Sequence, residues 1–118
     1  MAVVRILVAI EPHMYREVLA FHFRQERPLS EVTLASPQTL WAEALRTRPH
    51  LIIANEVLPE LKEEIGVFFW VELSTDDGLV AHISADGYST TIHDVSLQNL
   101  VAAVDKAEEG LAHDQQEA

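Results

Sequence analysis

The stretch Leu51-Ile52-Ile53-Ala54-Asn55-Glu56-Val57-Leu58-Pro59 decides the fold of this 118-residue chain. Its first four residues are apolar and follow a helix-like segment that ends in Arg48-Pro49. A short, continuous apolar run of this kind is typical of a strand that is buried on both faces of a parallel sheet. Asn55 and Glu56 are therefore expected at the carboxyl end of a central strand, where open α/β sheets bind their ligands.

The chain before this strand alternates strand-like and helix-like segments. Residues 5–10 form another apolar run, residues 12–26 repeat apolar side chains at helical spacing, and residues 31–35 again have the composition of a strand. A second helix is predicted over residues 37–48, since Ser36-Pro37 is a typical helix start and Pro49 stops it. The resulting βαβαβ order predicts a parallel sheet with right-handed crossovers.

The second half of the chain departs from this regularity. Residues 67–73 predict a fourth strand, after a segment with room for only about two helical turns. Residues 79–84 and 88–92 are strand-like and follow turn signals, so they predict an antiparallel addition in place of a further helix. Residues 95–111 predict the last helix. One domain is expected over residues 1–111, followed by a disordered acidic tail, 112–118.

Composition and charge exclude several classes of function. The chain has no cysteine, which excludes disulfides and thiolate chemistry and is compatible with the expected cytoplasmic location. Its net charge is -11, so nucleic-acid binding is not expected, and no apolar run approaches the length of a membrane span. Residues 1–48 carry a net charge of +1, whereas residues 49–118 carry two cations against fourteen acids, a net of -12.

These features resemble the receiver domain of two-component response regulators over roughly residues 4–111. The resemblance implies a flavodoxin-like, three-layer α/β fold with a parallel core sheet, in which strand or hairpin replaces the fourth helix. Asn55 stands where that family has its phosphate-accepting aspartate, and Pro59 stands where its proline follows. Matching Glu11-Pro12 to the Glu-Pro that closes the first strand puts Ala9 and Ile10 in place of the Mg²⁺-binding acids.

The other chemical positions of the family are also altered. Tyr88 matches the aromatic switch residue, whereas Thr91 takes the place of the lysine that would neutralise a phosphoryl group. The resemblance therefore implies a pseudo-receiver: a regulatory module that is not an enzyme, holds no metal or cofactor, and acts through protein–protein contacts.

Two further hypotheses place chemistry or contacts elsewhere. Glu11, His13 and Glu56 are expected at one edge of the sheet and would serve a small-ligand or metal sensor, or a small enzyme. A homodimer is also expected, on an apolar face left bare by the missing helix. The remaining strand-end candidates are Glu72 and Ser74, and the candidates for the dimer interface are Phe68, Phe69, Trp70 and Ile83.

Overall fold

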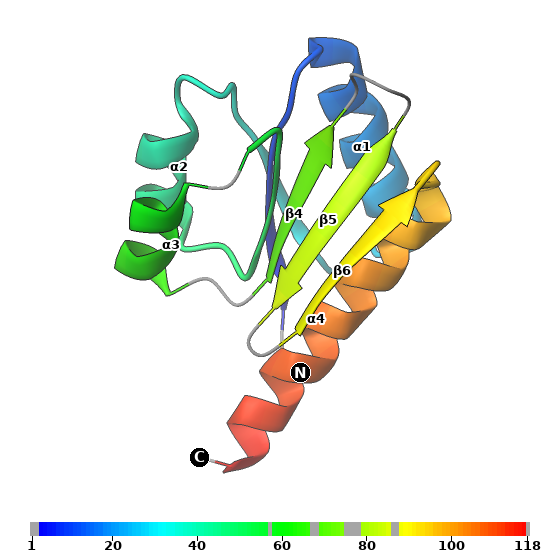
Figure 1. Cartoon of the computed structure of the whole chain (residues 1–118). Coiled ribbons are helices and arrows are strands. Elements are labelled where there is room, and N and C mark those ends of the chain that lie inside the picture. The colour runs from blue at the N-terminus through cyan, green and yellow to red at the C-terminus, as the bar shows by residue number, and fades with distance from the viewer. Residues whose placement is uncertain (1–2, 57, 67–68, 75–78, 86–87, 118) are drawn as a thin grey trace.

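The computed structural model of the chain describes residues 3–56, 58–66, 69–74, 79–85 and 88–117. Within these ranges the backbone forms six strands and four helices. The strands build one sheet in the order β2-β1-β3-β4-β5-β6 (Figure 1). The protein is therefore an α/β protein with a central mixed sheet.

The first four strands of the sheet are parallel. Strand β1 (Arg5–Ala9) lies between β2 (Glu31–Leu34) and β3 (Leu51–Ala54), and β3 pairs in turn with β4 (Phe69–Ser74). All four residues of β3 are buried, as are the last four of β1, because helices cover both faces of this part of the sheet. The predicted βαβαβ order and parallel core are confirmed.

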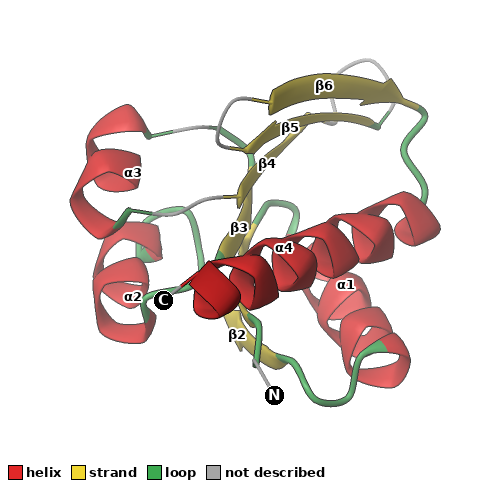
Figure 2. Cartoon of the chain, turned by 90° about the horizontal axis from the view of Figure 1, so that it is seen from below, coloured by secondary structure: helices red, strands yellow, loops and turns green. Residues whose placement is uncertain are grey.

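Helices form a layer on each side of the sheet. Helices α1 (His13–Glu26) and α4 (Leu97–Glu117) lie on one face, and α2 (Leu40–Thr47) and α3 (Pro59–Ile65) lie on the other (Figure 2). Helix α3 begins with a proline at its first turn, where no N–H is needed. It ends at Gly66, whose φ of 64° suits a residue without a Cβ atom.

A hairpin extends the sheet beyond β4. Strand β5 (Val80–Ala85) runs antiparallel to β4, and strand β6 (Tyr88–His93) runs antiparallel to β5. The predicted antiparallel addition is thus confirmed. Among the described residues, no helix lies over β5 and β6 on the side of α2 and α3 (Figure 2).

The alternation of side chains along these strands overturns the reasoning behind the expected interface. Phe69 and Ile83 belong to the core beneath α1 and α4, and Trp70 belongs to the core beneath α2 and α3. Ile83 is only 6% exposed and Trp70 is fully buried. These three side chains are therefore core residues of the single chain, and Phe68 lies outside the described residues.

The uncovered face of the hairpin is polar rather than apolar. His82 and Thr91 lie side by side on it and are exposed, with a ring nitrogen of His82 2.7 Å from the Thr91 hydroxyl. Glu72 stands opposite His82 in the register of β4 and β5. A sheet face of this composition needs no cover, so the missing helix leaves no apolar surface at His82 and Thr91.

Helix α4 is longer than the sequence indicated. Its backbone stays helical through residues 112–117, where we expected a disordered tail, and this end extends past the sheet (Figure 1). Alanine, glutamate and glutamine are good helix formers and make up most of this segment. Their propensity continues the helix that the apolar stripe of residues 97–111 begins.

Candidate functional site at the carboxyl ends of the strands

The parallel strands end together at the upper edge of the sheet in Figure 1, beside the start of α1. Ala9 of β1, Ala54 of β3 and Glu72 of β4 are neighbours in the register there. Strands β1 and β3 end at Ala9 and Ala54, so Glu11 and Asn55 meet at this edge. This is the place where the sequence predicted a degenerate receiver site.

Asn55 ties three chain segments together at this edge. Its Oδ1 accepts a hydrogen bond of 2.7 Å from the backbone N–H of Glu11. Its Nδ2 donates to the backbone carbonyl of Glu11 at 3.2 Å and to that of Leu73 at 3.3 Å. The amide thereby joins the end of β3 to the loop after β1 and to the end of β4.

The chemistry of this tie needs an amide. A carboxylate accepts hydrogen bonds but donates none, so an aspartate at this position would satisfy the N–H of Glu11 and oppose the two carbonyls. The bond to the Leu73 carbonyl is part-buried, which increases the cost of leaving that carbonyl unpaired. The side chain of Asn55, which matches the phosphate-accepting aspartate of receiver domains, is therefore engaged in hydrogen bonds to the backbone.

The acids and histidine proposed for a sensor do not converge. His13 Nε2 lies 3.1 Å from Glu17 Oε1, one turn further along α1, and both side chains are about two-thirds exposed. Glu11 and Glu56 are exposed as well. Within the described part of the chain, no three His, Asp or Glu side chains are grouped so that they could hold a metal ion.

The remaining strand-end candidates lie on β4. Glu72 and Ser74 are half-buried, and they pair across the ladder with His82 and Val80. The hairpin thus brings Glu72, His82 and Thr91 into one row on the polar face. This row is not among the sites predicted from the sequence, although the polar residues that alternate with Ala81 and Ile83 indicate it.

Tyr88 does not lie near Asn55. It pairs with Ala85 at the turn of the hairpin, level with the beginning of β4. Asn55 follows the end of β3, at the opposite end of the sheet. His93 is the β6 residue nearest to the end of β4, because it pairs with Val80, which pairs with Ser74. The position of Tyr88 therefore gives no support to its assignment as a switch residue.

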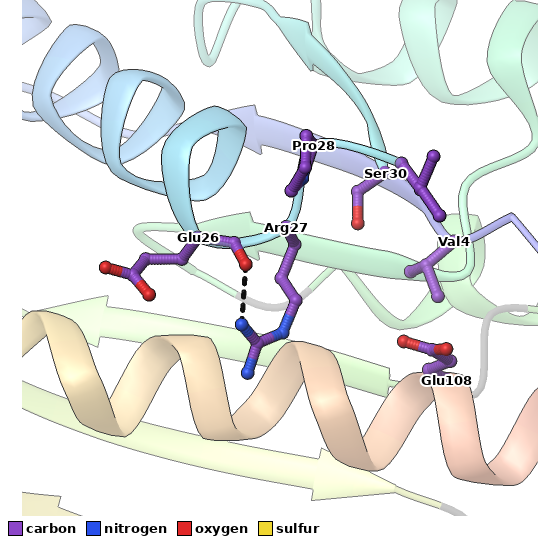
Figure 3. Close-up of a pocket in the computed structure, with 7 residues that line it drawn as sticks. Val4, Glu26, Arg27, Pro28, Ser30 and Glu108 are labelled. Carbon is purple, nitrogen blue, oxygen red and sulfur yellow. Dashed lines mark hydrogen bonds between the residues drawn. The ribbon is translucent and has the colours of Figure 1, made fainter.

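A hollow of about 230 Å³ lies at the opposite end of the strands, between α1, the loop before β2 and α4 (Figure 3). Arg27 reaches from the end of α1 toward α4 (Figure 3). Its Nε and Nη2 donate to the Asp105 carboxylate at 2.6 Å each. Its Nη1 donates to the carbonyl of Glu26, also at 2.6 Å. The remaining charged side chains that line the hollow are those of Glu26 and Glu108.

These contacts make the hollow a poor anion site. Hydrogen bonding to Arg27 lowers the pKa of Asp105, and the same bond raises the pKa of Arg27. All three guanidinium nitrogens are engaged within the protein, and the neighbouring charges are negative. The pair instead fastens the end of α1 to α4.

His50 is a structural histidine close to the same end. Its Nδ1 accepts a hydrogen bond of 3.0 Å from the backbone N–H of Arg5, and the backbone N–H of His50 donates to the carbonyl of Arg5 at 2.8 Å. Burial lowers the pKa of His50, and the positive charge of Arg5 acts in the same direction. The neutral imidazole therefore supports the start of β1.

Comparison of the chain with protein-family models, with curated proteins and with solved structures found no match. None of the helices in the described ranges combines the length and the apolar character that crossing a membrane requires.

Proposed function

We propose that this protein is a non-enzymatic regulatory module with a receiver-like, flavodoxin-like fold, which is not phosphorylated and acts through protein–protein contacts in the cytoplasm. It uses no cofactor and does not bind nucleic acid, in keeping with its net charge of -11. The strand order β2-β1-β3-β4 and its parallel direction support the flavodoxin-like part of the proposal. The antiparallel hairpin of β5 and β6 is a departure from that fold.

The hydrogen bonding of Asn55 is the observation that carries the proposal. Phosphoryl transfer to a receiver needs a carboxylate nucleophile together with charges that neutralise the equatorial oxygens. At this edge the candidate position holds an amide that binds the backbone of Glu11 and Leu73. Ala9 and Ile10, which match the metal-binding acids, are buried apolar residues. At the carboxyl ends of the strands, Asn55 thus holds the end of β3 to the loop after β1 and to the end of β4.

Acetyl phosphate with Mg²⁺ tests this proposal. We expect the intact mass of the protein to stay unchanged and the fluorescence of Trp41 and Trp70 not to shift. The Asn55→Asp variant restores the nucleophile alone and is expected to remain unmodified, because the metal ligands and the lysine are still missing. A stable acyl phosphate on either protein would overturn the proposal.

The competing hypothesis is a metal or small-ligand sensor at Glu11, His13 and Glu56. The pairing of His13 with Glu17 disfavours it, since the imidazole is directed along α1. Calorimetry with Mg²⁺, Mn²⁺ and Zn²⁺ separates the two hypotheses. We expect no saturable heat; a micromolar site that is lost in Glu11→Ala would establish the sensor instead.

A further inference from the structure

Helix α1 presents large apolar side chains to solvent. Met14 and Phe21 are 64% and 63% exposed, and Val18 between them is 44% exposed. Their spacing of four and three residues places them on one face of the helix. The opposite face carries Leu19, Ala20 and Phe23, which are buried in the core. The helix is therefore apolar on both sides, although the core needs only one of them.

This outer face continues across to α4. Tyr15 and Val18 of α1 and Leu97 of α4 are among the lining of an apolar groove of about 220 Å³. Tyr15 is 38% exposed and Leu97 is 36% exposed. Helices α1 and α4 lie side by side on the same face of the sheet (Figure 2). We call Met14, Tyr15, Val18, Phe21 and Leu97 together the α1 surface.

The area of the α1 surface fits one side of a dimer. Aromatic side chains bury roughly 150–250 Å² each. At about 200 Å² for each of the five residues, their exposed fractions correspond to roughly 500 Å² of mostly apolar surface. One partner of a standard interface buries about 800 Å², of which about 65% is apolar in homodimers, again about 500 Å². Single apolar residues on a surface need no explanation, whereas a contiguous patch of this size is often functional.

Charge favours a second copy of the chain on this surface. Residues 1–48, which include α1, carry a net charge of +1, whereas residues 49–118 carry -12. Two copies that met through strands β4 to β6 would bring acidic halves together and repel. Two copies that meet through α1 place the nearly neutral part of the chain at the centre of the contact and leave the acidic α4 at its rim. The earlier expectation of a dimer thus moves from β4 and β5 to α1.

We propose that the protein forms a homodimer in which α1 packs antiparallel against α1 of the second copy, around a two-fold axis close to Val18. The stripe of Met14, Val18 and Phe21 is nearly symmetric about that point, so each Met14 lies level with Phe21 of the other copy. Such an interface is isologous, as closed dimers require, and contacts between methionine sulfur and an aromatic ring are favourable. Tyr15 and Leu97 form its rim. The inference deepens the proposed function by naming its partner.

Analytical ultracentrifugation of the full chain tests the dimer. Phe21→Glu and Met14→Glu place a charge on the α1 surface, and Trp41→Glu makes a matched change on α2, on the other face of the sheet. We expect the wild type and Trp41→Glu to form dimers at low and high salt. Phe21→Glu should raise the dimer Kd at least about 100-fold, since each dimer loses two buried rings. Met14→Glu should act in the same direction.

Three outcomes would overturn the proposal: a wild type that stays monomeric at millimolar concentration in both salts, a dimer that Phe21→Glu and Met14→Glu leave unchanged, or a dimer that Trp41→Glu disrupts equally. Circular dichroism of each variant verifies that it is folded, as expected for substitutions at exposed positions. The phosphorylation experiment is independent of this one. A monomer that takes no phosphoryl group refutes the α1 dimer and leaves the proposed function standing.

Discussion

Replacing Asn55 separates its role as a tie from any role as a failed phosphate acceptor. Asn55→Ala removes all three hydrogen bonds to Glu11 and Leu73. Each such bond contributes about 0.5–1.5 kcal/mol net, and two of the three lie at exposed positions, so the loss is about 2 kcal/mol. At roughly 4 °C per kcal/mol for a domain near this size, the melting temperature should fall by about 8 °C.

Asn55→Asp should have a similar effect at neutral pH for a different reason. The introduced carboxylate keeps the bond from the N–H of Glu11 but faces the carbonyl oxygens of Glu11 and Leu73, which now lack a donor. Repulsion from these carbonyls raises the pKa of the introduced carboxyl in the folded state above that in the unfolded chain. Its deficit in stability is therefore full above the folded pKa and shrinks as the pH falls through it, because the protonated group can donate again.

Urea denaturation of both variants and the wild type, between about pH 7 and about pH 4.5, measures this difference. The deficit of Asn55→Asp should shrink toward acid pH, whereas that of Asn55→Ala should stay constant. The reasoning fails if Asn55→Asp is as stable as the wild type at pH 7, or if the two variants lose stability in parallel at every pH.

Three further changes probe other contacts. Because burial lowers the pKa of His50, its neutral form stabilises the fold above about pH 6.5, and this contribution is lost as the pH falls below that value. His50→Asn keeps a hydrogen-bond acceptor and should flatten this part of the pH profile of unfolding. An unchanged profile would contradict the role assigned to His50. Arg27 lowers the pKa of Asp105, so their bond stabilises the fold fully above the pKa of the unfolded chain, and this contribution shrinks as the pH falls toward the folded pKa. Asp105→Asn should therefore lower the melting temperature by a few degrees at pH 7 and by less at pH 3, and an equal loss at both would refute the pairing. Ile83→Ser should cost about 3 kcal/mol or more in chemical denaturation, whereas His82→Ser on the exposed face should cost less than about 1 kcal/mol, and equal costs would contradict the observed register.

Much of the fold follows from local patterns in the sequence. The apolar run Leu51–Ala54 identifies a buried parallel strand, and the same kind of run identifies β1. Turn signals and alternation locate the hairpin of β5 and β6. These predictions succeed because strand burial, turns and crossovers are set by residues that are close together in sequence.

The site and the surfaces depend on contacts between distant segments. Asn55 binds Glu11 and Leu73, which are 44 and 18 residues away, so no local sequence pattern predicts these hydrogen bonds. The face to which Trp70 or Ile83 turns depends on the register of β4 and β5. Helix α1 has two apolar faces, and its sequence alone does not decide which one packs on the sheet. The row of His82 and Thr91 likewise forms only once the hairpin is paired.

Amide NMR spectra of the isotope-labelled protein, recorded with and without Mg²⁺ and beryllofluoride as a mimic of a phosphoryl group, test the central claim most directly. If Asn55 is a structural tie and the protein works through its surface, the amides of residues 9–11, 13 and 55 should not shift. Shifts at these amides that saturate with beryllofluoride would show that the strand ends still bind a phosphoryl group and would contradict the account.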